Sequence, residues 1–138
     1  WRARVGIAGI SMGGFTAFAS ALYDPKPRIC APMIASPDWY AFSAGGSNVP
    51  PEKRLAGPCD FPTRFCGLPL LAIVAGKDSI VSPEPAKEFV QKLKKCYFAR
   101  SGLYELVEYP ESEHFMRESD WNDAWRKIIA WGKKHLSP

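Results

Sequence analysis

The sequence predicts an α/β domain in which helices cover a mostly parallel sheet of about four strands. Short apolar runs typical of strands alternate along the chain with segments of helical periodicity, which favours a parallel sheet. One of these runs, Leu70–Ala75, is apolar at every position, as expected for a strand buried on both faces of such a sheet. The 138 residues suit one domain, and a hydrophobic fraction of 46% is enough to bury a core.

The first predicted strand, Val5–Ile10, leads directly into a serine that lies between glycines. In Gly9-x-Ser11-x-Gly13 we predict a tight turn with the serine at its tip, because an apolar helical run follows at once. A Cβ at either glycine would meet the adjacent strand or helix, so both are expected on steric grounds. The helix that begins near Met12 directs free backbone N–H groups at the turn, where they can hold negative charge. Taken alone, such a turn is as often structural as catalytic.

A helix and a second strand follow this turn. The segment Phe15–Tyr23 is almost wholly apolar, which predicts a helix buried all round, and the prolines within 24–27 end it. The second predicted strand is Ile29–Ala35. It contains Pro32, which a central strand does not readily accept.

The segment from 36 to 69 is rich in glycine, proline, serine and aromatic residues and shows no clear period. A long irregular segment inside a compact domain is usually functional or mobile. It predicts a lid or the wall of a substrate pocket, with Trp39, Tyr40 and Phe42 as candidate lining residues. A surface excursion with a few packed aromatic side chains fits the same composition.

The second half of the chain alternates helix and strand. Ser82 and Pro83 can start a helix, and Ser119 can cap the last one. These two helices carry apolar stripes at helical spacing: Ala86, Phe89, Val90 and Leu93 in the first, and Trp121, Ala124, Trp125, Ile128, Ile129, Gly132 and Leu136 in the second. The strand between them, Tyr104–Tyr109, contains two glutamates, which predicts a position near the sheet edge.

Charge and cysteine content argue against several classes of function. The net charge of +4 comes from cations that are not gathered in one run, and many end predicted helices, where His135 is also expected to complement the helix dipole. This disfavours nucleic-acid binding. The four cysteines form no CxxC pair, so no metal is expected, and the chemistry outlined below needs no cofactor. Cys59 and Cys66 either form a small loop disulfide or are free thiols, as the weakly favoured cytoplasmic location implies. No apolar run is long enough to span a membrane, and the oligomeric state is left open.

Three residues with complementary chemistry follow three of the predicted strands. Ser11 follows the first, Asp78 the third and His114 the fourth. Since parallel strands end at the same edge of a sheet, these side chains are expected to meet there. A serine hydroxyl needs a base to take its proton, an imidazole can take and return it, and a carboxylate fixes the imidazole tautomer. Glu111 and Glu113, beside the histidine, are the alternative acids.

Each of these residues lies in a longer motif. Ser11 lies in Gly-Ile-Ser-Met-Gly-Gly, Asp78 in Gly-Lys-Asp-Ser-Ile-Val-Ser-Pro, and His114 in Tyr-Pro-Glu-Ser-Glu-His. In this order the motifs resemble the C-terminal half of α/β-hydrolase serine esterases, and most closely the prolyl oligopeptidase-like and dienelactone hydrolase-like branch. The resemblance covers nearly the whole chain. Dienelactone hydrolases proper use a cysteine nucleophile, whereas this chain has a serine.

The resemblance implies an α/β-hydrolase fold of about eight strands, of which residues 1–138 would form the C-terminal half. The part before Trp1 would supply one N–H group of the oxyanion hole, which leaves the Met12 N–H as the donor in this chain. Loss of one such donor typically slows the reaction by about two to three orders of magnitude. The chain in isolation is therefore expected to be a poor catalyst or inactive.

The motifs and the resemblance together predict a serine hydrolase, and specifically a carboxylesterase that cleaves small to medium acyl esters through an acyl-enzyme. Two alternatives stay open. One is a serine peptidase of prolyl oligopeptidase type that acts on short peptides, and the other is a non-catalytic protein of the same fold that binds a small ligand. The expected partner of the esterase is a small-molecule ester.

Overall fold

Four parallel strands form the centre of the computed structural model, which describes residues 4–24, 27–41 and 49–136. The strands of this described part are β1 (Gly6–Ile10), β2 (Ile29–Met33), β3 (Leu70–Ala75) and β4 (Tyr104–Tyr109). They lie in the order β1-β2-β3-β4, and each neighbouring pair is parallel. The predicted α/β class with a parallel sheet is confirmed, as is the position of Tyr104–Tyr109 at an edge.

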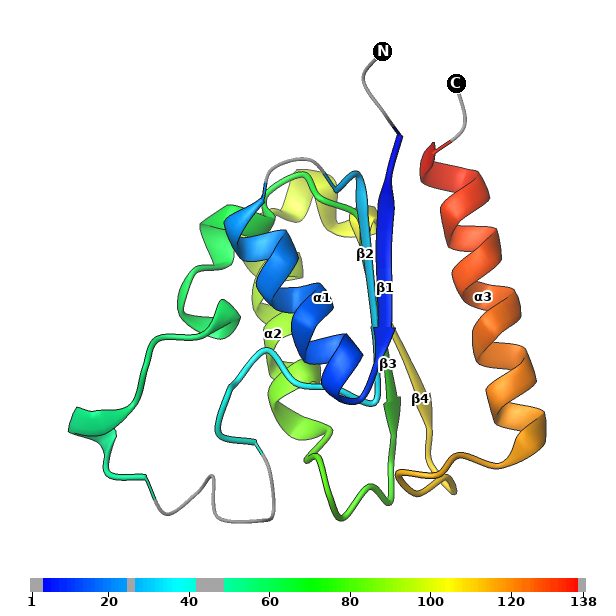
Figure 1. Ribbon diagram of the computed structural model, residues 1–138. Helices are drawn as coiled ribbons and strands as arrows, with labels where there is room; N and C mark the ends of the chain where they lie inside the picture. Colours follow the sequence, from blue (N-terminus) through cyan, green and yellow to red (C-terminus); the bar gives the residue numbers. More distant parts are fainter. Residues whose placement is uncertain (1–3, 25–26, 42–48, 137–138) are drawn as a thin grey trace.

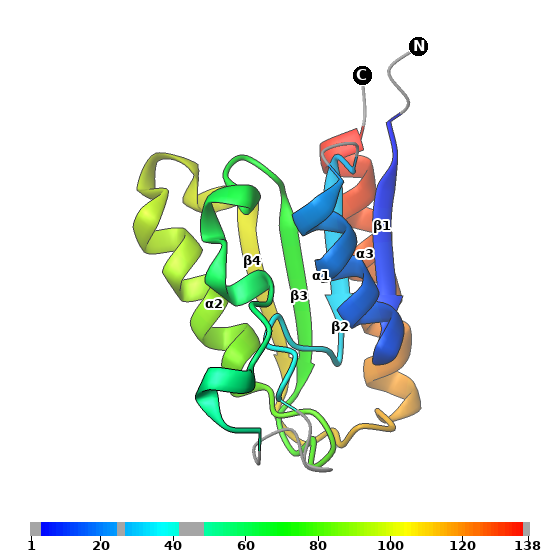
Figure 2. The same cartoon turned by 60° about the vertical axis from the view of Figure 1, so that its left-hand side comes forward.

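Helices cover both faces of the sheet. They are α1 (Met12–Tyr23), α2 (Glu84–Cys96) and α3 (Glu118–Leu136). The first two lie on one face and α3 lies on the other, as Figure 1 and Figure 2 show. The carboxyl ends of all four strands point toward the lower end of the molecule in these views. The loops that follow the strands therefore share one edge.

Strand β3 supplies side chains to two separate hydrophobic cores. Leu70 and Ala72 pack in a cluster with residues of α1 and α2, whereas Leu71 and Ile73 pack in a cluster with residues of α3. Successive side chains of a strand point to opposite faces, so a strand covered on both sides must be apolar at every position. Each buried leucine or isoleucine side chain stabilises the fold by roughly 1.5–3 kcal/mol.

Strand β2 accepts Pro32 although it lies between β1 and β3. The amides of Cys30 and Ile34 donate to the carbonyl oxygens of Pro69 (2.9 Å) and Ile73 (2.8 Å). Alternate residues of β2 thus donate toward β3, and Pro32 occupies the position between these two donors. Because proline has no N–H, one rung of the ladder is missing there, and the rungs on either side hold the strand in register.

The composition of α1 predicted a helix buried all round, but the helix is exposed on one side. Thr16 and Tyr23 are exposed, the latter at 73%. The helix forms the outer layer of the domain, so only the side that faces the sheet is covered. The start of α3 also differs from the prediction, since the helix already includes Glu118, and Ser119 lies in its first turn instead of capping it.

Two residues of α3 differ from the prediction. Ile129 is 56% exposed, and the buried stripe is Ala124, Ile128 and Trp131. At 3.6 residues per turn, Ile129 lies about 140° around the helix from Ala124, away from the sheet. The His135 ring is tilted against that of Trp131, and within the described residues its Nε2 atom has no hydrogen-bond partner. Burial, and then the nearby charge of Lys134, lowers the pKa of its imidazole, which works against its predicted role as a complement to the helix dipole.

In its described residues, 34–41 and 49–69, the segment between β2 and β3 contains three short 3-10 helices, η2 (Pro51–Lys53), η3 (Pro58–Asp60) and η4 (Pro62–Phe65). The last of them anchors the segment to the domain. Phe65 is fully buried, and its ring packs edge-on against Phe89 of α2, with centroids 5.1 Å apart, and lies near Phe18 of α1. The predicted excursion is thus joined to the main core at its carboxyl end.

All four cysteines are free thiols. Of the two alternatives for Cys59 and Cys66, the structure therefore has the unpaired state. Cys66 is exposed, whereas Cys59 is half-buried. Burial and the nearby carboxylates of Asp60 and Asp38 raise the pKa of the Cys59 thiol to about 11.

This difference predicts the order in which the thiols react. We expect iodoacetamide at pH 8 to alkylate the exposed Cys66 and Cys96 at least about tenfold faster than Cys59, because the thiolate is the reactive form. Mass spectrometry of the native protein, with and without reductant, measures the three rates. A Cys59–Cys66 disulfide would instead protect both thiols until reductant is added.

Candidate active site

Ser11 occupies a strained turn between β1 and α1. Its backbone has φ 50° and ψ −116°, a combination that residues other than glycine rarely adopt. Its N–H donates to the Met33 carbonyl oxygen at 2.9 Å, and its own carbonyl oxygen accepts from the amides of Gly14 (2.9 Å) and Phe15 (3.0 Å). These bonds hold the serine in a conformation that costs on the order of 1–3 kcal/mol.

The crowded glycines at this turn are not the pair that the motif predicted. A Cβ at Gly9 would lie 2.1 Å from the Gly13 carbonyl oxygen, so Gly9 is required as expected. A Cβ at Gly13 would meet nothing within 4 Å apart from its own helix, so the expected steric need there is wrong. The second crowded position is Gly14, where a Cβ would lie 2.4 Å from the Ala35 Cβ, because α1 passes close to the end of β2.

The structure brings Ser11, Asp78 and His114 together in one hydrogen-bonded chain. The Ser11 Oγ atom lies 3.0 Å from His114 Nε2, and His114 Nδ1 lies 2.8 Å from Asp78 Oδ2. A carboxylate can only accept, so the neutral imidazole that fits both contacts donates from Nδ1 and accepts the serine hydroxyl at Nε2. The side chains of His114 and Asp78 are 11% and 1% exposed. This series of hydrogen bonds can therefore move a proton away from the serine oxygen.

The acid of this chain is fixed by its own turn. Asp78 Oδ1 accepts hydrogen bonds from the amides of Ile80 and Val81, both at 2.9 Å. This leaves Oδ2 for the histidine. The carboxylate is thus oriented before the imidazole contacts it, which fixes both the tautomer and the ring orientation of His114.

The alternative acids point elsewhere. Glu111 is paired at the surface with Lys77, whose hydrogen bond lowers the pKa of this carboxyl group. Glu113 is exposed to solvent. Asp78 is the carboxylate that the structure places against the histidine.

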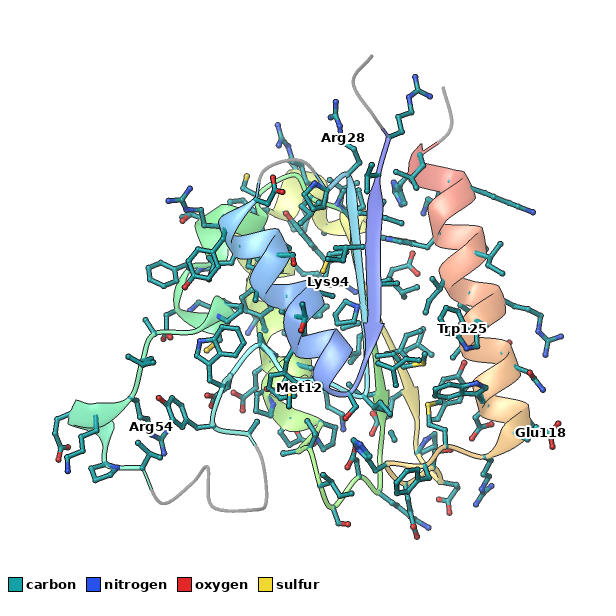
Figure 3. The ribbon with its side chains drawn as sticks, viewed as in Figure 1. Met12, Arg28, Arg54, Lys94, Glu118 and Trp125 are labelled. Atoms are coloured by element: carbon teal, nitrogen blue, oxygen red, sulfur yellow. The ribbon has the colours of Figure 1, made fainter. Side chains whose placement is uncertain are left out.

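Met12, the predicted oxyanion donor, is the first residue of α1 and lies at the carboxyl edge of the sheet (Figure 3). An amide in the first turn of a helix has no acceptor within that helix and points back along its axis. The Met12 N–H is therefore available next to Ser11. The second donor expected before Trp1 stays a prediction.

Trp39, one of the three predicted pocket residues, packs against the start of α1. Its ring stacks on that of Phe15 with centroids 6.4 Å apart, and its Nε1–H donates to the Ala56 carbonyl oxygen at 3.0 Å. This contact attaches the excursion to the helix that follows Ser11. Phe42 lies outside the described residues.

Tyr40 lines a cavity of about 310 Å³ within the excursion. The remaining lining residues are Asp38, Arg54, Leu55, Ala56, Cys59 and Asp60. In Figure 3, Arg54 lies well out on the excursion and far from Met12. This cavity is thus separate from the turn that holds Ser11, and the role of Tyr40 in a substrate pocket stays a prediction.

Exposed apolar side chains follow the members of the Ser11–His114–Asp78 chain closely in the sequence, and they were not predicted. Met12, Ile80 and Phe115 are 68%, 39% and 88% exposed, and each follows a member of the chain by one or two residues. The Phe115 ring stands edge-on to His114, with centroids 5.6 Å apart. We call these three side chains the apolar rim. Their signal in the sequence was a large apolar residue just after each polar one.

The described part of the chain gives no sign of a metal site or a membrane span. No group of three or more His, Cys, Asp or Glu side chains among the described residues is placed to hold a metal ion. None of the helices resolved between residues 4 and 136 is long and apolar enough to cross a bilayer.

Comparisons with solved structures identify the fold. A search with family models and a search of curated proteins each found no match. The chain is similar to a Pyrococcus horikoshii acylaminoacyl peptidase, with 20% identity and a TM-score of 0.75 over 99% of this chain and 25% of the peptidase. It is also similar to the Pyrococcus furiosus esterase Pf2001, with 17% identity and a TM-score of 0.71 over 97% of this chain and 55% of the esterase. The chain is similar as well to a candidate dienelactone hydrolase from Klebsiella pneumoniae, with 18% identity and a TM-score of 0.64 over 91% of this chain and 50% of that protein.

These likenesses define a class of fold. The chain has the α/β-hydrolase fold, which confirms the fold that the motifs implied. It spans about half the length of the esterase and of the candidate dienelactone hydrolase.

The strain at Ser11 predicts the effect of two substitutions on stability. Ser11→Gly and Ser11→Ala both remove the hydroxyl, but only glycine adopts φ 50° without strain. We expect the glycine variant to be more stable than the alanine variant by about 1 kcal/mol, as measured by urea unfolding. Equal stabilities would contradict the strain.

The two later glycines of the motif predict a second pair of effects. Gly13→Ala should leave stability unchanged or raise it by up to about 1 kcal/mol, because alanine favours a helix and finds open space there. Gly14→Ala should lower it by about 1–3 kcal/mol through overpacking against Ala35. Urea unfolding of both variants measures this, and the opposite order would show that the motif glycine is the crowded one.

Proposed function

We propose that the protein is a serine hydrolase that cleaves carboxylic esters through an acyl-enzyme. One observation carries this proposal. A serine held in strained backbone makes a 3.0 Å contact with a histidine whose other ring nitrogen lies 2.8 Å from a buried carboxylate. This is the geometry needed to activate a hydroxyl that is a poor nucleophile at neutral pH.

In the proposed reaction, Ser11 Oγ attacks the carbonyl carbon of the ester while His114 Nε2 takes the hydroxyl proton. Asp78 holds the imidazole in place and stabilises the imidazolium that forms. The histidine then gives the proton to the leaving alcohol. Water, activated by the same imidazole, releases the acid and restores the serine.

The negative charge of the tetrahedral intermediate needs donors beside Ser11. The Met12 N–H at the start of α1 would supply one, aided by the positive end of the helix dipole. Each donor of this kind is worth roughly 3–4 kcal/mol of transition-state stabilisation. A second donor from outside residues 1–138 is part of the proposal.

The apolar rim favours an ester with an apolar acyl or alcohol group. Met12, Ile80 and Phe115 are exposed apolar side chains within two residues of Ser11, Asp78 and His114, whereas a peptide would need polar partners for its backbone. A small-molecule ester of short to medium chain length fits this surface. Trp39, Tyr40 and Phe42 stay candidates for the outer wall of the pocket.

Two other functions remain in the proposal as alternatives. The first is a serine peptidase on short peptides, which the likeness to an acylaminoacyl peptidase favours. The second is a ligand-binding protein without turnover. Cleavage of an amide substrate at a rate similar to that of the matching ester would favour the peptidase, and ligand-induced stabilisation without product would favour the binding protein.

Labelling with a fluorophosphonate probe tests the proposal directly. We expect the full-length protein to be labelled at Ser11, as located by mass spectrometry, and the label to disappear in Ser11→Ala. Asp78→Asn should keep the serine but lower kcat on a p-nitrophenyl ester by about 10³–10⁴-fold, because the imidazole would take the wrong tautomer.

The matched control is Ser79→Ala, which removes an exposed hydroxyl next to Asp78. It should keep both the label and the ester activity. Labelling that survives Ser11→Ala, or a protein that no concentration of probe modifies, would refute the proposed nucleophile.

A further inference from the structure

We propose that Ser112 is a positioning residue that sets His114 against Asp78, an inference that rests on the proposed function. Ser112 lies two residues before the histidine and is fully buried. It is one of three buried polar or charged residues among those described, together with Asp78 and Ser36. A buried hydroxyl needs partners, so its contacts show what it holds together.

Ser112 makes four hydrogen bonds. Its Oγ–H donates to Asp120 Oδ2 at 2.7 Å, and its Oγ accepts from the Arg117 amide at 3.3 Å. Its carbonyl oxygen accepts from the Lys77 amide at 2.9 Å, and its own amide donates to the Tyr109 carbonyl oxygen at 3.1 Å. One residue thus joins the end of β4, the loop that carries His114, the first turn of α3 and the loop that carries Asp78.

The bond from the Lys77 amide joins the loop that carries Asp78 to the loop that carries His114, next to the two residues of the proposed proton path. Lys77 immediately precedes Asp78, and the Gly76 amide donates to the Tyr109 carbonyl oxygen at 2.8 Å. The backbones are in direct contact there, since a Cβ on Gly76 would lie 2.7 Å from the Pro110 Cα. A shift of Ser112 would therefore change the position of Asp78 relative to the histidine loop.

The bond to Asp120 connects this pair of loops to a rigid element. Asp120 lies in the first turn of α3, and α3 is held against the sheet by its buried stripe of Ala124, Ile128 and Trp131. The Oγ of Ser112 thus fixes the histidine loop to a helix that packs on the far face of the sheet. The histidine loop is thus bonded both to the end of β4 and to the first turn of α3.

Other contacts across these loops are weaker constraints. Glu111 pairs with Lys77 and lies 3.9 Å from Arg117, but all three side chains are more than half exposed. Exposed ion pairs contribute little and hold no fixed geometry. The buried hydroxyl of Ser112 is therefore the side-chain contact that fixes the histidine loop to α3. Misplacement of reacting groups by about 1 Å can cost about a hundredfold in rate.

The test compares Ser112→Ala with Ser36→Ala in the full chain. Ser36 is buried to the same extent, and its Oγ accepts from the Asp38 amide, in a loop that does not carry the histidine or its acid. The readouts are kcat and KM on a p-nitrophenyl ester, and the imidazole resonances of His114 by NMR. The chain has only two histidines, so these resonances are readily assigned.

We expect Ser112→Ala to lower kcat by about 10- to 100-fold with KM nearly unchanged, and to weaken the downfield Nδ1–H resonance of His114. Ser36→Ala should leave the His114 resonance unchanged, because its loop carries neither the histidine nor its acid. Asp120→Ala should reproduce the effect of Ser112→Ala, and Asp120→Asn, which keeps an oxygen that can accept from Ser112, should restore most of the activity.

Two outcomes would overturn the proposal. One is an equal effect of the two serine substitutions on kcat and on the His114 resonances, which would mark Ser112 as a general packing residue. The other is a normal His114 signal in Asp120→Ala, a variant that tests the contact even where Ser112→Ala fails to fold. If the full-length wild-type protein has no activity, the proposed function fails, but the His114 resonances still decide whether Ser112 positions the ring.

Discussion

The parallel pairing of all four strands is the constraint on which the candidate site depends. It places the carboxyl ends of β1, β3 and β4 at one edge, so that Ser11, Asp78 and His114 converge although up to 103 residues separate them. Strand β2 contributes in a different way. It separates β1 from β3, and its last carbonyl oxygen, on Met33, accepts the Ser11 amide. If β1, β3 or β4 ran antiparallel, the residue that follows it would move to the opposite end of the sheet.

Two-sided burial of the sheet makes this edge rigid enough to support strain. The side chains of β3 alternate between a core shared with α1 and α2 and a core shared with α3. The strand ends are thus held from both faces, and the positive φ of Ser11 is maintained by bonds to β2 and to the first turn of α1. The free energy that the strained turn costs is small compared with the free energy gained when the apolar side chains of these two cores are buried. The turn at Ser11, the proposed nucleophile, is therefore locally strained backbone held in place by the packed sheet around it.

The sequence predicted the strand ends because the side-chain periods of helices and strands locate the elements, and the carboxyl ends of parallel strands share one edge of the sheet. It placed Ser11, Asp78 and His114 without any knowledge of contacts. It failed where a property of a residue depends on how closely two elements pack in three dimensions. Gly14, not Gly13, is crowded because α1 passes close to the segment after β2, and the pKa of His135 is lowered because the end of α3 is partly buried. Ser112 gave no signal at all, since a serine in a polar loop becomes informative only when its buried partners are known.

The proposed proton path and the proposed substrate surface depend on different parts of this fold. The path from Ser11 through His114 to Asp78 is enclosed, with the last two side chains 11% and 1% exposed. The apolar rim beside it is open, and Phe115 is 88% exposed. Water at this rim would screen the charges that form during the proposed reaction, because electrostatic effects strengthen as water leaves a site. An apolar ester that lies on the rim would itself displace that water. In the proposed enzyme, the substrate class that the rim favours is thus also the one that helps to make the serine chemistry effective.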